Sequence, residues 1–157
     1  FACRIKNFNF MEIRNIMAIN IEKLNDDLVN LVLKKNELSR LDYSNPEYDT
    51  VEEELHDLED EFLKVHGKEM EEVFKTIHEE FCPDNEVLLP IAYLAKKYKV
   101  KKGSGGDVEF SVSGDEGVIV DVDNYSDKLT RLVLVPNPSR ILLQIDSSHS
   151  EEVWKLD

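Results

Sequence analysis

The chain has 157 residues and a formal net charge of −14, with 41% hydrophobic and 33% charged residues. This length and composition indicate one domain with a core, and the negative charge opposes general binding to nucleic acids and anionic membranes. The apolar runs are shorter than the roughly 18 residues that a membrane helix needs. The two cysteines, Cys3 and Cys82, form neither a disulfide framework nor a zinc-binding pattern. We therefore expect a cytoplasmic protein with reduced thiols.

Residues 1–19 show no regular pattern. They lack the continuous apolar stretch of about 7–15 residues that a signal peptide needs. We expect a disordered or non-native leader here, with Met11 or Met17 as the natural start.

Residues 20–82 predict an acidic helical hairpin, with Asn20 capping the first helix and Asn45-Pro46 starting the second. Apolar residues recur at spacings of three or four in both helices, namely Ile21, Leu24, Leu28, Leu31 and Leu38, then Val51, Leu55, Leu58, Phe62 and Val65. At Gly67 we expect a kink or break.

The second helix is the longer one, by roughly 20 Å at 1.5 Å per residue. Its last turns carry an apolar stripe that includes Met70, Phe74, Ile77 and Phe81. No part of the first helix reaches this stripe, so either the C-terminal zone or a second copy of the chain must cover it.

The rest of the chain divides into two zones. Residues 83–106 predict a short buried helix over 88–95, then a joint rich in lysine and glycine. Residues 107–157 alternate apolar and polar side chains in about five short runs, which predicts an antiparallel β-meander packed on the helices. The expected fold class is therefore α+β.

The stretch from Thr50 to Phe62 contains seven acidic residues and no lysine or arginine. The acids lie opposite the apolar stripe, as on the solvent face of a helix. Glu53 and His56 have the Glu-x-x-His spacing of di-iron bundles, but such sites need a second pair that the chain lacks, so we expect no metal. Residues 20–82 have 19 acidic and 7 basic residues, so the surface can also dock on a basic partner.

Five lysines form the one basic cluster: Lys96, Lys97, Lys99, Lys101 and Lys102. They precede the glycines, whereas a P-loop has its lysine after them. A lysine-rich helix end, a protein contact and a phosphate contact are the three interpretations, and we expect the first.

We expect neither a catalytic residue nor a cofactor. Cys82 and His78 lie four residues apart at the end of the second helix. The negative end of a helix dipole raises the pKa of a thiol, which disfavours Cys82 as a nucleophile.

The strings VLLPIAYLAKKY and LVLVPNPSRILLQID resemble an uncharacterised family of hypothetical proteins from Bacteroidota-type bacteria. The resemblance covers about residues 20–157. It implies no activity, cofactor or site.

These observations predict a non-enzymatic cytoplasmic adaptor that binds a basic protein surface or a second copy of itself. The predicted contact residues are Glu52, Glu53, Asp57, Asp60, Glu61, Met70 and Phe74. The alternative is a nucleic-acid accessory factor that uses the lysine cluster, or whose acidic hairpin occupies a basic nucleic-acid site.

Overall fold

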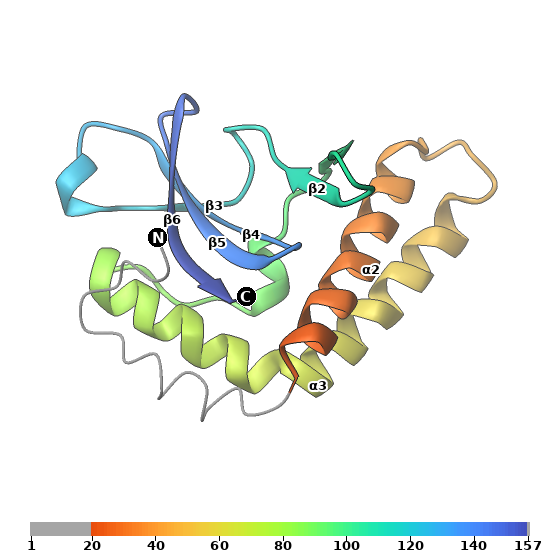
Figure 1. The fold of residues 1–157 in the computed structure, drawn as a ribbon, viewed down its shortest axis with the longest axis horizontal. Helices are drawn as coiled ribbons and strands as arrows, with labels where there is room; N and C mark the ends of the chain where they lie inside the picture. Colours follow the sequence, from red (N-terminus) through yellow and green to blue (C-terminus); the bar gives the residue numbers. More distant parts are fainter. Residues whose placement is uncertain (1–19, 157) are drawn as a thin grey trace.

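In a computed structural model, which describes residues 20–156, two helices precede two antiparallel sheets (Figure 1). The helices are α2 Ile21–Ser39 and α3 Tyr48–Phe81, with short 3-10 helices η1 Pro90–Tyr93 and η2 Asp123–Tyr125. The strands are β1 Lys99–Lys102, β2 Val108–Ser111, β3 Val118–Val120, β4 Thr130–Val135, β5 Ser139–Ile145 and β6 His149–Leu156. This confirms the predicted α+β class. The predictions for residues 1–19 lie outside the described residues.

The two helix starts are stabilised in different ways. The Asn20 side chain accepts a hydrogen bond from the Lys23 N–H at 3.1 Å, which confirms the predicted cap of α2. The second helix begins at Tyr48, later than the predicted start at Pro46. The Asn45 side chain instead accepts from the Glu47 N–H at 2.9 Å and fixes the turn that leads into α3.

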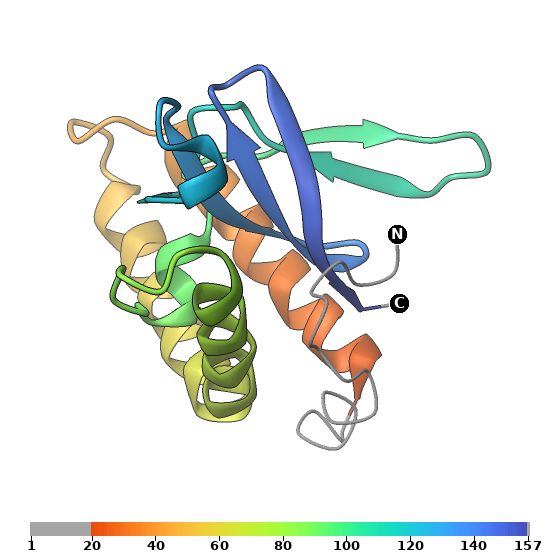
Figure 2. The ribbon, with the colours of Figure 1, turned by 90° about the vertical axis from the view of Figure 1, so that its left-hand side faces the viewer.

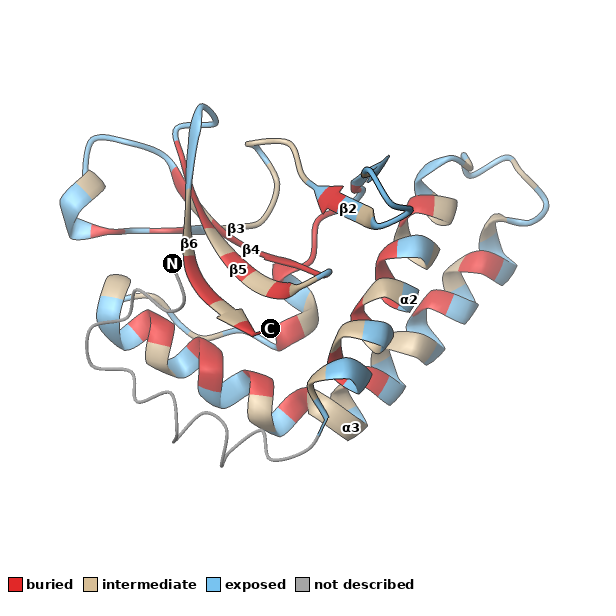
Figure 3. Ribbon diagram, viewed as in Figure 1, coloured by how far each residue is buried: buried red, intermediate tan, exposed pale blue. Residues whose placement is uncertain are grey.

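The second helix is unbroken through Gly67, so the alternative of a break there is wrong. Figure 1 nevertheless shows α3 changing direction between its yellow first half, which runs antiparallel to α2, and its green second half. The second half passes beneath the sheet, and its turns are coloured as buried on one side (Figure 3). Met70, Phe74 and Ile77 of this half are buried in one core with residues of the strands. The C-terminal zone of the same chain therefore covers the apolar stripe of α3.

The meander contains four strands in the order β3-β4-β5-β6. Residues Leu132 to Val135 in β4 are all fully buried, as expected for a central strand with both faces covered. The segment between β2 and β3 is held against β5, because Gln144 Nε2 donates to the carbonyls of Ser113 at 2.8 Å and Glu116 at 3.1 Å. None of the helices among residues 20–156 is both long and apolar enough to cross a membrane.

The middle of the chain differs from the prediction. The expected helix over 88–95 is a four-residue 3-10 turn, η1. The lysine segment 99–102 is strand β1, which pairs with β2 and removes the first predicted strand from the meander. The glycine joint 103–106 connects β1 to β2, and Figure 2 shows this two-stranded ribbon projecting from the rest of the molecule.

A buried polar clamp connects α2 to the sheet. Asn36 Oδ1 accepts from the Tyr98 N–H at 2.7 Å, and Asn36 Nδ2 donates to the Tyr98 carbonyl at 3.1 Å. The Tyr98 hydroxyl donates to the Leu134 carbonyl of β4 at 2.6 Å and accepts from the Ala95 N–H at 2.9 Å. Burial raises the pKa of Tyr98, so this hydroxyl stays protonated and keeps its role as a donor.

Candidate interaction surfaces

The acidic flank is the outward surface of the first half of α3, formed by Glu52, Glu53, Asp57, Asp60 and Glu61. Val51, Leu55 and Phe62 on the opposite side of the same turns are buried, so helical periodicity turns these carboxylates outward. Glu52 is half-buried and the other four residues are exposed. The structure therefore brings the predicted acids together on one solvent-facing surface.

The negative charge of the acidic flank is not compensated by ion pairs among residues 20–156. Lys34 of α2 contacts Glu54 at 2.6 Å and Glu37 at 3.0 Å, and these hydrogen bonds raise the pKa of Lys34. Within residues 20–156, none of the five flank carboxylates has a basic side chain within ion-pair distance. Like charges spaced along one helix face repel each other, which a basic partner would relieve.

The two apolar residues of the predicted contact set have a different place. Met70 and Phe74 are fully buried, and the Phe74 ring stacks on Tyr93 of η1 with ring centroids 3.8 Å apart. Neither side chain has surface to present to a partner. We correct the prediction for these two residues accordingly: they belong to the core of their own chain.

His78 and Cys82 are held in the structural core. His78 Nδ1 donates to the Asn85 carbonyl at 3.0 Å, and Nε2 lies 2.8 Å from the Tyr93 hydroxyl. Both ring nitrogens are thus occupied. Burial, with a smaller contribution from the Asp121 carboxylate, raises the pKa of the Cys82 thiol to about 11, so at neutral pH it is not the thiolate that nucleophilic catalysis needs.

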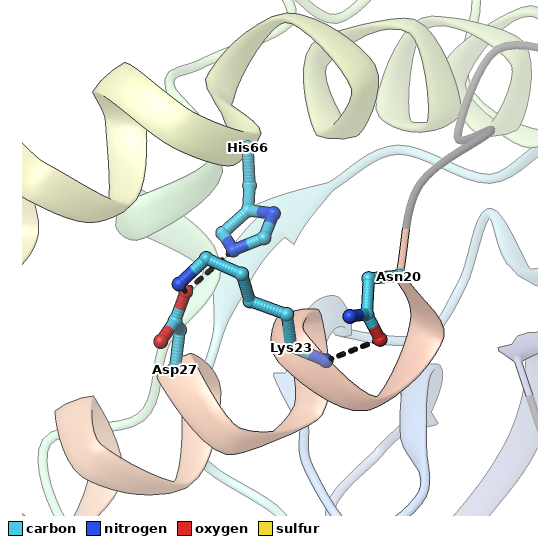
Figure 4. A network of polar contacts seen from close by, with 4 residues as sticks. All are labelled: Asn20, Lys23, Asp27 and His66. Atoms are coloured by element: carbon cyan, nitrogen blue, oxygen red, sulfur yellow. Dashed lines mark hydrogen bonds and ion pairs between the residues drawn. The ribbon is translucent and has the colours of Figure 1, made fainter.

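The remaining histidines do not assemble a metal centre. His66 of α3 contacts Asp27 of α2 at 2.7 Å, and Lys23 contacts the same carboxylate at 3.1 Å (Figure 4). This network joins the two helices near the start of α2. Among residues 20–156, no three histidine, cysteine, aspartate or glutamate side chains are grouped so as to hold a metal ion.

The basic ribbon is the projecting pair of strands β1 and β2 together with Lys96 and Lys97. The expected helix end is wrong here, because Lys99, Lys101 and Lys102 lie in a strand whose four residues are all exposed. Lysines on an exposed edge strand hinder edge-to-edge aggregation. None of the five lysines forms an ion pair with another described residue.

The sequence did not reveal an acidic groove of about 740 Å³ between the start of α2, strand β2 and the turn from β4 to β5. Glu22 and Asp26 line it from α2, and Asp107 and Glu109 line it from the ribbon. The i,i+4 and i,i+2 spacings place each pair on one face of its element. Nothing in the sequence indicates that the two elements meet.

No family model, curated protein or solved structure matches this chain.

Proposed function

We propose that the protein is a non-enzymatic cytoplasmic adaptor whose acidic flank docks on the basic surface of a partner protein. The observation that carries this proposal is the set of five carboxylates on one outward face of α3 with no ion-pair partner among residues 20–156. A hairpin that packs against a sheet gives these charges a rigid backbone, which lowers the entropy lost on binding.

The burial of Met70 and Phe74 means that these two side chains do not contribute apolar area to the proposed contact with a partner. Self-association through the apolar stripe of α3 loses its support, because the stripe is already inside the core. A mainly electrostatic contact remains, which favours fast association and selection of a basic partner more than high affinity.

Capture of partners from a nuclease-treated lysate with charge-reversed variants tests this proposal. The flank variant carries Glu53→Lys, Asp57→Lys and Asp60→Lys, which lie at i, i+4 and i+7 on one helix face. We expect it to lose the proteins that the wild-type chain retains. Equal recovery by the flank variant and the wild type would refute the proposal.

A matched control separates the flank from the overall charge. The control variant carries Glu71→Lys, Glu72→Lys and Glu79→Lys, which are exposed on the second half of the same helix and produce the same change in net charge. We expect the control variant to retain the partner. If it loses the partner as well, net charge decides the interaction and the flank does not.

A second candidate function is contact with nucleic-acid phosphates through the basic ribbon. It is favoured by the projection of the ribbon from the molecule (Figure 2) and by the exposed positions of all five lysines. A two-stranded ribbon has dimensions that fit the major groove of a duplex. The test is recovery without nuclease treatment: if it depends on intact nucleic acid, weakens steeply with salt and is lost on replacing Lys99 and Lys101 with glutamine, this function takes precedence.

A further inference from the structure

A second cavity, which we call the tip pocket, lies at the turn of the helical hairpin, away from the acidic groove. Its volume is about 550 Å³, and ligand pockets typically have about 300–1,000 Å³. Leu38, Leu41 and Leu55 form an apolar wall. A cavity of this size with such a wall can hold the apolar part of a small ligand.

Two tyrosines form the rim of the tip pocket. Tyr43 and Tyr48 both line it, with ring centroids 4.8 Å apart and an angle of 48° between the rings. The side chain of Tyr43 is 88% exposed, so packing in the free chain does not account for this aromatic residue. A ring of a ligand placed against this pair would gain offset or edge-to-face aromatic contacts.

Two ammonium groups provide the polar side of the pocket. Lys35 from α2 and Lys96 from the segment before β1 both line it, and neither forms an ion pair or a side-chain hydrogen bond within residues 20–156. Burial lowers the pKa of Lys35, the charges of Glu59 and Glu116 oppose this effect, and the like charge of Lys96 adds to it. The desolvation of Lys35 is therefore only partly compensated.

The carboxylates around the pocket are already engaged or distant. Asp42 lines the cavity and its negative charge opposes an anion there, but it contacts neither lysine. Its Oδ1 accepts from the Ser44 N–H at 3.0 Å and from the Ser44 hydroxyl at 2.5 Å. The Glu116 carboxylate accepts from the Lys97 N–H at 3.1 Å. Glu59 attracts Lys35 without contacting it. An anion in the pocket would therefore find two ammonium donors and no competing direct partner among the described residues.

We propose that the tip pocket binds a carboxylate carried on an aromatic body, with the carboxylate between Lys35 and Lys96 and the ring against the tyrosines and leucines. This chemistry is shared by free aromatic acids and by the C-terminal phenylalanine of a polypeptide. A cation in the same position would be repelled by the two lysines. The proposal is independent of the acidic flank, which attracts charge of the opposite sign.

Titration of the full chain with N-acetylphenylalanine, followed by amide chemical shifts, tests the proposal. N-acetylphenylalaninamide is the matched probe, because it keeps the ring and removes the charge. We expect saturable shifts at residues 38–48 with the acid and roughly tenfold weaker binding of the amide. Equal binding of acid and amide, or the absence of saturable shifts at the hairpin turn, would overturn the proposal.

Variants locate the charge that binds the carboxylate. The double variant Lys35→Gln and Lys96→Gln should weaken binding of the acid by roughly tenfold or more. The double variant Lys99→Gln and Lys101→Gln changes the net charge equally, but both residues lie in strand β1 outside the lining of the tip pocket, so it should bind the acid as the wild type does. Equal weakening in both double variants would contradict the proposed position of the carboxylate.

A five-residue peptide ending in a free phenylalanine distinguishes the two sources of the ligand. Tighter binding of the peptide than of the free acid assigns the pocket to a polypeptide terminus. Equal or weaker binding of the peptide assigns it to small aromatic acids. Both results support a carboxylate pocket, provided that the acid binds at the hairpin turn.

Discussion

Replacing Asn36 with alanine should show whether the buried clamp holds the helical hairpin on the sheet. The side chain of Asn36 is 4% exposed and forms two hydrogen bonds with the backbone of Tyr98, at 2.7 and 3.1 Å. The two residues are 62 positions apart, so these bonds connect elements that have no local link. The substitution leaves the Tyr98 N–H and carbonyl without their protein partner.

The expected loss of stability follows from the two backbone groups of Tyr98 that lose their hydrogen-bond partner. A buried polar group without a partner costs about 1–3 kcal/mol, and the pair would cost roughly twice that if neither relaxed. Alanine is a better helix former than asparagine by up to about 0.7 kcal/mol, which offsets a small part. We expect a loss of about 2–4 kcal/mol in the free energy of unfolding, a large fraction of the 5–15 kcal/mol typical of a domain.

Urea unfolding, followed by circular dichroism, measures this loss. Asn30→Ala is the matched control, because Asn30 is exposed on the same helix. The control should change the free energy of unfolding by less than about 0.5 kcal/mol. Indistinguishable stabilities of the two variants would refute the conclusion that the clamp contributes to stability.

Four further substitutions follow from burial, close approach and charge. Phe74→Ala should lower the free energy of unfolding by about 3–5 kcal/mol in the same urea assay, because the ring is fully buried on Tyr93; a loss below about 1 kcal/mol would contradict its place in the core. By calorimetry, Gly67→Ala should stabilise α3 by up to about 1 kcal/mol, since the new Cβ meets only ordinary contacts at 3.6 Å. Gly114→Ala should destabilise the protein, because its Cβ would clash with the backbone carbonyl oxygen of Ser147, and the opposite order of the two glycine variants would refute the packing described. Burial tends to raise the pKa of Asp27, but hydrogen bonds from His66 and Lys23 outweigh it and lower that pKa below 3.8. A lowered folded pKa gives stability that is present above 3.8 and lost as the pH falls through the folded value, so the stability advantage of the wild type over Asp27→Asn should shrink in acid unfolding series below pH 3.8. An advantage that stays constant with pH would contradict this linkage.

The parts of the fold that the sequence predicted correctly are those with one buried face. The helical stripes of α2 and α3, the alternation in the first part of β5 and the continuous apolar run of β4 all reflect which side chains are buried, and these patterns are visible in the sequence. The cap at Asn20 is equally local, because its hydrogen bond reaches only three residues along the chain.

The parts of the fold that the sequence did not predict lack a periodic pattern of buried and exposed side chains. All four residues of β1 are exposed, so no apolar alternation marks Lys99–Lys102 as a strand, and its pairing with β2 depends on the turn at 103–106. A lysine-rich segment before glycines is equally typical of a helix end. No pattern of buried residues therefore distinguishes strand β1 from a helix end in the sequence.

The candidate surfaces differ in the same way, because only those formed within one element can be predicted from local spacing. The five carboxylates of the acidic flank share one helix face, which spacing alone predicts. The burial of Met70 and Phe74 in their own core does not follow from spacing, because the sequence does not reveal which element covers an apolar stripe. The acidic groove and the tip pocket are each built from segments far apart in the chain, and no local pattern brings Glu22 near Glu109, or Lys35 near Lys96.

The most direct test of the adaptor proposal is the Kd of the captured basic partner, measured at low and at physiological salt for the wild type and both charge-reversed variants. If the acidic flank is the docking surface, the flank variant should bind roughly tenfold or more weakly, while the control variant stays within about twofold of the wild type. All three proteins should bind more weakly as salt increases. Equal weakening by the two variants would show that net charge governs binding and would contradict a specific role for the acidic flank of α3.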